Sequence, residues 1–180
     1  TNDGTSPMFT AAHRGHIACI TALVSSGGDI DKCNNHGASG IFIAAQEGHS
    51  SCISELIRLK SDVNKCDKNG VHPIFIAAKN GRPDCVALLA SAGGDVNKCD
   101  DEGVSPIFIA AKEGHASCIS QLVSFGGALN NYREYACAVE EALAKMNASK
   151  KDFKRQSKHQ KAIDDCFLAI QKQSSLNKLQ

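Results

Sequence analysis

The sequence of 180 residues has no long apolar segment. A membrane-spanning helix needs about 18 consecutive apolar residues, whereas the apolar stretches of this chain, such as 41–45, are short. We therefore expect no membrane span. The formal net charge is only +1, so the composition gives no indication of a nucleic-acid or membrane-surface partner.

The motifs of common active sites are also absent from the sequence. It has no phosphate-binding loop, no nucleophile elbow, no HExxH zinc motif and no pair of cysteines separated by two residues. We therefore predict that the chain is not an enzyme and that it needs neither a metal ion nor a cofactor. It shows no export signal and begins with Thr1 rather than Met, so we expect a processed chain or a segment of a longer one.

The sequence does contain a block that recurs with a period of 33 residues. Its four copies begin at Gly4, Gly37, Gly70 and Gly103, and the fourth copy reads Gly-Val-Ser-Pro-Ile-Phe-Ile-Ala-Ala-Lys-Glu-Gly-His. A fixed period of this size is typical of stacked-repeat proteins, in which each unit buries its apolar face against its neighbours. The period therefore predicts an all-α repeat solenoid with an extended surface.

Each unit is predicted to fold as two short antiparallel helices followed by an extended connection. In the fourth copy, Ser105 precedes Pro106, which places a capping residue just before a proline at the first helical position. Apolar residues at the spacing of a buried stripe, for example Cys118, Ile119 and Leu122, predict the second helix.

These blocks resemble the repeats of the ankyrin family. The residues that match the family pattern are Gly94-Asp95-Val96-Asn97 and Asp100-Asp101-Glu102-Gly103-Val104-Ser105-Pro106. The resemblance covers 1–131 and implies an ankyrin-type stack of helix-turn-helix units with β-hairpin-like finger loops. The four repeats would span about 1–33, 34–66, 67–99 and 100–131. One departure is a phenylalanine where the family has a histidine in its first helix, at Phe9, Phe42, Phe75 and Phe108.

The two ends of the array are predicted to differ. No degenerate capping unit precedes the first copy, although a terminal repeat needs a polar outer face. We therefore expect Met8, Phe9 and Leu23 to form an uncovered apolar side, which further repeats or a partner would cover. After Tyr132 the repeat pattern dissolves, and 132–180 is predicted to form a degenerate capping helix followed by a basic C-terminal helix.

The final helix contains a basic segment. From Lys150 to Lys161 there are six basic residues and one acidic residue, a composition that would attract an acidic partner. A solvated helix face is the simpler interpretation. Phe153 is the one aromatic residue of this segment, so stacking on bases is poorly supported and we expect no nucleic-acid partner.

Seven of the nine cysteines follow the 33-residue period in two series. The first series is Cys19, Cys52, Cys85 and Cys118, and the second is Cys33, Cys66 and Cys99. Equivalent positions in stacked units lie about 8–10 Å apart, whereas the Cα atoms of a disulfide lie within about 7 Å. We therefore expect free thiols and an intracellular, reducing compartment. By resemblance, the first series is core and the second lies on the fingers, where either a small residue is needed or an oxidisable thiol lies beside a lysine.

In the ankyrin family, partners usually dock on the concave side, which consists of the finger tips and the exposed face of the first helices. The resemblance implies a non-catalytic scaffold that binds a partner protein in this way. By position, the contact residues would be His13, Arg14, Asn35, His36, Gln46, Glu47, Lys68, Asn69, Lys79, Asn80, Asp101, Glu102, Lys112 and Glu113. The alternative is a structural accessory subunit that is permanently integrated in a larger multiprotein assembly.

Overall fold

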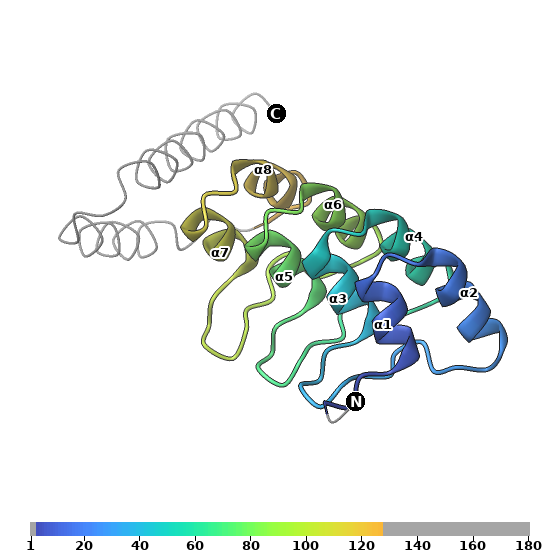
Figure 1. Ribbon diagram of the computed structural model, residues 1–180. Coiled ribbons are helices and arrows are strands. Elements are labelled where there is room, and N and C mark those ends of the chain that lie inside the picture. Colours follow the sequence, from blue (N-terminus) through green and yellow to red (C-terminus); the bar gives the residue numbers. More distant parts are fainter. Residues whose placement is uncertain (1–2, 128–180) are drawn as a thin grey trace, which may run out of the picture.

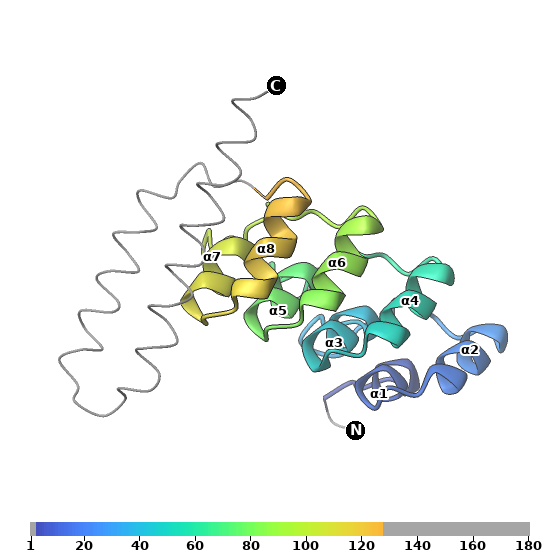
Figure 2. The ribbon, with the colours of Figure 1, turned by 90° about the horizontal axis from the view of Figure 1, so that it is seen from above.

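The computed structural model describes residues 3–127, which form two rows of short helices (Figures 1 and 2). The first row consists of α1 (Pro7–His13), α3 (Gly40–Glu47), α5 (Pro73–Lys79) and α7 (Pro106–Lys112). The second row consists of α2 (Ile17–Ser25), α4 (Ser50–Arg58), α6 (Pro83–Ser91) and α8 (Ala116–Ser124). Each helix packs on its neighbours within its row and on the other helix of its pair. The predicted all-α repeat stack is confirmed for this part of the chain.

Serine hydroxyl groups cap three of the four first-row helices. Oγ of Ser6, Ser39 and Ser105 accepts a hydrogen bond from the backbone N–H of Phe9, Phe42 and Phe108, at 3.1, 3.4 and 3.3 Å respectively. Such a cap contributes about 1 kcal/mol. The helix α5 is the exception, because His72 stands at its cap position and its side chain makes no capping hydrogen bond.

The core is one continuous apolar layer that runs along the stack. The helices α3 and α5 lie between two other first-row helices, and residues 40–45 and 73–78 are buried. The second row contributes a line of fully buried aliphatic side chains, among them Ile20, Ile53, Leu89 and Ile119. Each repeat therefore buries its apolar face mainly against the next repeat, as expected for a solenoid.

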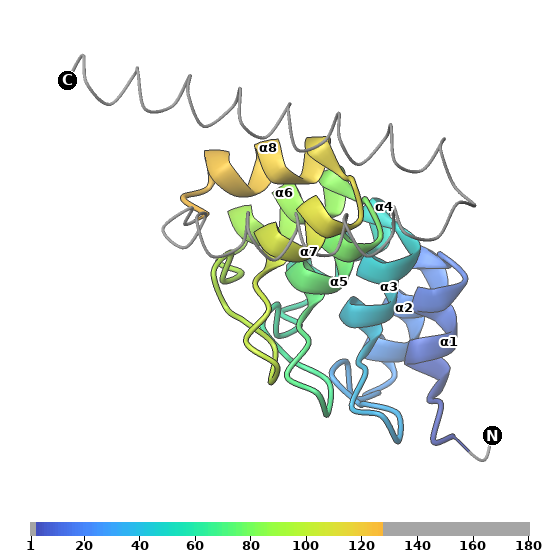
Figure 3. The same ribbon diagram turned by 90° about the vertical axis from the view of Figure 1, so that its left-hand side faces the viewer.

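The loops that connect one helix pair to the next form fingers, which extend below the stack in Figures 1 and 3. Each finger is numbered by the repeat that it leads into, so the tips of the second, third and fourth fingers are closed by the side chains of Asn34, Asp67 and Asp100. The oxygen of each side chain accepts the backbone N–H groups two and four residues further on, at 2.8–3.1 Å. The backbone N–H of the same residue donates to the carbonyl four residues on. The fingers are thus hairpin-like, although residues 3–127 contain no β-strand.

The prediction for the amino-terminal side was wrong for Met8. This side chain is only 3% exposed, because it faces the second repeat. Its Cγ lies 3.3 Å from the point that a Cβ on Gly40 would occupy. This close approach leaves little room for a side chain at Gly40, which stands where other copies have proline. Phe9 and Leu23, the other two residues of that prediction, are partly buried.

The prediction that all four cysteines of the first series are core was wrong for Cys19. Cys52, Cys85 and Cys118 are at most 1% exposed, whereas Cys19 is exposed. The three buried thiols belong to helices that pack on a preceding second-row helix, and α2 begins that row. The same sequence position is therefore core in three repeats and surface in the first.

Some predictions fall outside the described residues. They are the degenerate capping helix and basic helix of 132–180 and the acidic-partner site from Lys150 to Lys161. One helix pair lies within each of the four predicted repeat ranges, and the exact repeat boundaries stay a prediction.

Candidate functional site

The predicted contact residues of the first helices gather in one row, which we call the helix rim. It consists of His13, Arg14, Gln46, Glu47, Lys79, Asn80, Lys112 and Glu113, at the carboxyl ends of α1, α3, α5 and α7. Gln46, Glu47 and Glu113 are half-buried, and the other five residues are exposed. The row therefore offers polar side chains from four consecutive repeats.

Hydrogen bonds between repeats fix the backbone of the helix rim. The imidazole Nε2 of His49 lies 3.0 Å from the carbonyl oxygen of His13, and Nε2 of His115 lies 3.1 Å from the carbonyl oxygen of Lys79. A carbonyl oxygen can only accept, so each ring nitrogen donates an N–H. These two loop histidines therefore brace the helix rim by binding the preceding repeat.

In the third repeat an arginine replaces the bracing histidine. Nε of Arg82 donates to the carbonyl oxygen of Gln46 at 3.3 Å, which is the equivalent atom of the preceding repeat. This residue was not predicted from the sequence, because Arg82 matches the repeat only by its position after Gly81. That position was the signal that could have identified it.

The predicted finger residues form a second row, which we call the finger rim. It consists of Asn35, His36, Lys68, Asn69, Asp101 and Glu102, and all six are exposed. Backbone hydrogen bonds join consecutive fingers. They run from Asn35 N–H to Asp3 O at 2.9 Å, from Lys68 N–H to His36 O at 3.0 Å and from Asp101 N–H to Asn69 O at 3.1 Å. The rim residues are therefore held in fixed positions while their side chains reach into solvent.

The structure brings the residues of each rim together but keeps the two rims apart. The fingers lead into the amino ends of the first-row helices, and the helix rim lies at their carboxyl ends (Figure 3). A helix of 7 residues such as α5 is about 10 Å long. A partner that touches both rims must therefore span the length of the first helices.

The helix rim carries charges of both signs, positive at Arg14, Lys79 and Lys112 and negative at Glu47 and Glu113. Lys79 and Lys112 end α5 and α7, which pack on each other. Within residues 3–127 the ion pairs are Arg58–Glu55, at 2.7 Å, and His13–Glu47, at 3.9 Å, the second only when His13 is protonated. Neither lysine has an ion-pair partner in that part of the chain, so both are available to acidic groups of another molecule.

The family of the chain follows from its repeats. A family profile described as "Ankyrin repeats (3 copies)" matches residues 1–65 and 41–134. The chain belongs to the ankyrin-repeat family. Ankyrin repeats are generally protein–protein interaction modules, and they are typically non-catalytic. No curated protein matches the chain.

The part of the chain that the structure describes contains neither a metal-binding cluster nor a membrane-spanning helix. Among the described residues, no group of three or more His, Cys, Asp or Glu side chains is placed to hold a metal ion. The helices of the same part of the chain are too short or too polar to cross a membrane.

The finger cysteines differ in exposure. Cys33 and Cys66 are half-buried, and Cys99 is exposed. Burial raises the pKa of the Cys33 thiol, and the nearby carboxylates of Asp31 and Asp29 act in the same direction, whereas the Lys65 ammonium lowers it. Cys33 therefore has less thiolate than an ordinary cysteine, which argues against the oxidisable-thiol hypothesis at this position.

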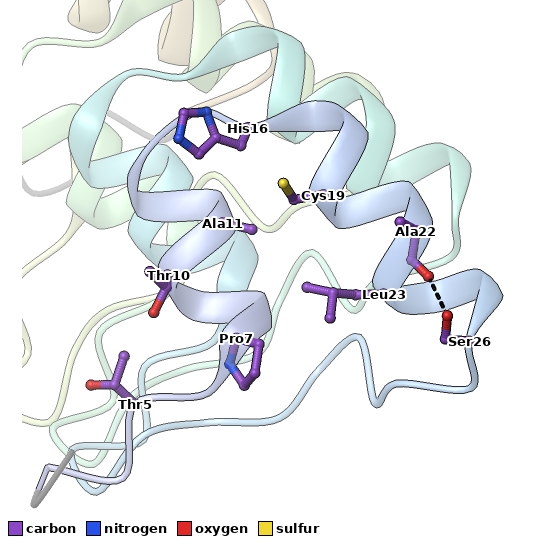
Figure 4. A pocket seen from close by; sticks show the side chains of 9 residues that line it. All are labelled: Thr5, Pro7, Thr10, Ala11, His16, Cys19, Ala22, Leu23 and Ser26. Atoms are coloured by element: carbon purple, nitrogen blue, oxygen red, sulfur yellow. Dashed lines mark hydrogen bonds between the residues drawn. The ribbon is translucent and has the colours of Figure 1, made fainter.

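The sequence analysis also missed a groove on the outer side of the first ankyrin repeat (Figure 4). The groove has a volume of about 650 Å³ and lies between α1 and α2. Its lining consists of Thr5, Pro7, Thr10, Ala11, His16, Cys19, Ala22, Leu23 and Ser26. His16 stands at the position of His49 and His115, and its imidazole makes no bracing contact among the described residues.

Proposed function

We propose that this ankyrin array binds a partner protein that lies across the helix rim and the finger rim. The observation that carries the proposal is the pair of rims, which present exposed polar side chains from consecutive repeats. Hydrogen bonds between repeats hold the backbone of both rims. A surface that is already ordered loses little conformational entropy on binding.

We further propose that the array binds its partner without catalysis. The rim side chains are largely exposed to water, where acid, base and nucleophilic groups are not activated by desolvation. An intracellular, reducing location is also proposed, because the seven cysteines of the described residues are free thiols.

The double substitution Lys79→Glu and Lys112→Glu tests the rim. We expect the partner to bind at least about tenfold more weakly, a loss of about 1.4 kcal/mol, because two positive charges facing the partner become negative. The partner is first identified by crosslinking and mass spectrometry of the native complex. Its Kd for each variant is then measured by isothermal titration calorimetry.

Lys79→Glu and Lys112→Glu are also measured as single variants, and Lys60→Glu is the matched control for each of them. Lys60 is exposed in the turn after α4, away from both rims, and it undergoes the same change of charge. Circular dichroism should show that the variants keep their helix content. If partner affinity is unchanged by both rim reversals, or falls equally in the Lys60 variant, the rim proposal is wrong.

A second candidate function is a permanent subunit of a larger assembly, and the groove of the first repeat favours it. In each interior repeat, the cysteine equivalent to Cys19 is buried against a neighbour. An outer face that keeps the same residues but exposes them is suited to contact with another protein.

Thiol labelling of Cys19 tests this second candidate. We expect maleimide to modify Cys19 in the isolated chain within minutes. Cys52, Cys85 and Cys118 should react only after unfolding, because they are buried and burial raises the pKa of Cys85 to about 11 and of Cys118 to about 12. Peptide mass spectrometry gives the labelled fraction at each cysteine. Protection of Cys19 in the purified native complex supports a permanent subunit, and equal labelling in both samples argues against it.

A further inference from the structure

A buried histidine occupies the place of a serine in the third repeat. His72 is 0% exposed, at the cap position that Ser6, Ser39 and Ser105 hold in the other repeats. Neither Nδ1 nor Nε2 of its ring has a hydrogen-bond partner. A neutral imidazole carries one N–H donor and one acceptor, and leaving a buried polar group unsatisfied costs about 1–3 kcal/mol.

The surroundings of His72 do not favour a positive charge. The ring of Phe75 lies against it in a tilted arrangement, with 6.5 Å between ring centroids. The charged groups that act on the ring are Lys98 and Asp95, on the connection between α6 and α7. The helices packed on α5 place their own charged side chains, Glu47 of α3, Asp84 of α6 and Lys112 of α7, at the other end of the first helix.

These surroundings lower the pKa of His72 from its ordinary value of 6.5. Burial is the main cause, and the positive charge of Lys98 adds to it. The carboxylate of Asp95 and the nearby backbone of Asp95 and Gly70 act in the opposite direction, without reaching hydrogen-bond geometry. In the folded protein at neutral pH the ring is therefore uncharged.

The lowered pKa makes stability depend on pH in one direction. Below pH 6.5 the unfolded chain binds a proton at His72 and the folded chain does not. The contribution of the uncharged His72 ring to the free energy of unfolding is therefore fully present above about pH 6.5. It is lost as the pH falls towards the folded pKa. Each unit by which the folded pKa lies below 6.5 raises the unfolding constant up to tenfold.

His72 lies next to the finger rim, so the loss of stability at low pH would act on that rim. It directly follows the third finger, whose Lys68 and Asn69 belong to that rim. The backbone of the third finger bonds to His36 of the second finger and to Asp101 of the fourth. Moving a charged imidazole to water must displace the base of this finger, because the side chain is wholly enclosed.

We propose that protonation of His72 opens the third finger and the start of α5, so that a partner held at neutral pH is released in mild acid. The release of a partner rests on the proposed function, whereas the opening itself does not. No other repeat has a histidine at the cap position. The acid response therefore starts in the third repeat.

The test compares the full chain with the variant His72→Ser, which installs the serine cap of the other repeats. Amide hydrogen exchange is followed by mass spectrometry at pH 7.5 and 5.5, with correction for the intrinsic exchange rate. We expect protection of residues 67–76 to fall several-fold in the wild-type chain at pH 5.5, with about tenfold as the upper limit for a ring that titrates at 6.5 once exposed, and to stay nearly constant in the variant. His16→Ser is the control, because His16 is an exposed loop histidine.

An NMR titration of the wild-type histidine rings is the second measurement, and it needs no variant to fold. A His72 resonance that titrates well below pH 6.5, or only with the onset of opening, supports the proposal. A His72 that titrates near 6.5 without change in protection overturns it, and so does an equal loss of protection in the His72→Ser chain. The rim proposal is tested separately, at pH 7.5, by the lysine reversals, so either proposal can fail without the other.

Discussion

Replacing Leu89 by alanine is expected to lower the free energy of unfolding by about 2–5 kcal/mol. Leu89 is 0% exposed and lies on α6, which packs on α4, α5 and α8. Removing its branched side chain takes away apolar contacts with several helices and leaves a cavity that this tight stack cannot easily fill. Urea unfolding followed by circular dichroism at pH 7.5 measures the loss.

Leu88→Ala is the matched control for this prediction. It makes the same chemical change one position earlier, where the side chain is only partly buried. We expect the Leu88 variant to lose less than half as much stability. Because repeat arrays are stabilised by contacts between neighbours, Leu89→Ala should also broaden the unfolding transition or divide it in two. Equal losses in the two variants would show that α6 does not have the assigned inward face.

Replacing Gly37 by alanine is expected to separate the second finger from the third. Gly37 has φ +83°, where an alanine costs about 1–2 kcal/mol. Its Cβ would also lie 2.8 Å from the backbone nitrogen of Lys68 and 3.1 Å from the backbone of Asp67. Backbone atoms cannot move aside as a flexible side chain can, so the hydrogen bond from Lys68 to His36 should break.

Gly103→Ala is the control for this second prediction, since Gly103 holds the same position in the fourth finger. Its φ is +78°, and a Cβ there would have no atom of residues 3–127 within 4 Å. Both variants place an alanine at a left-handed φ and are destabilised by it, and only Gly37→Ala adds a steric clash. We expect it to be less stable than the control by about 1 kcal/mol or more and to lose exchange protection at the Lys68 amide. Identical stability and protection in the two variants would contradict the packing of the fingers.

Most of the fold could be predicted because one pattern is repeated four times. The Ser-Pro pair of the fourth copy marks the start of α7, and the stripe through Cys118 and Leu122 marks α8. Lys60 stands where the other copies have glycine, and its φ of 70° is positive like theirs. Each of these features depends on residues close in sequence, which is why a single chain is enough to predict them.

The predictions that were wrong concern contacts that differ between copies of the repeat. Met8 was expected to be exposed and is buried against Gly40, whereas Cys19 was expected to be buried and is exposed. The repeat pattern gives each position the same role in every copy, but the first copy has a neighbour on only one side among the described residues. Which of its side chains face that neighbour is decided by packing rather than by the repeat.

The candidate site could be predicted only in outline. Family resemblance indicated which residues form the finger rim and the helix rim, and these residues do gather in two rows. It did not indicate that the rows lie at opposite ends of the first helices. It also gave no role to His72, because the unsatisfied ring becomes evident only when its enclosure by the third and neighbouring repeats is known.

The hydrogen bonds that brace the helix rim do not depend on pH in the way proposed for His72. An imidazole donates from Nε2 whether it is neutral or protonated, and a guanidinium group is always charged. The bonds from His49, Arg82 and His115 to the preceding repeat therefore need no particular protonation state. The backbone at the carboxyl ends of the first helices should therefore stay braced in an acidic vesicle and in a neutral cytoplasm alike.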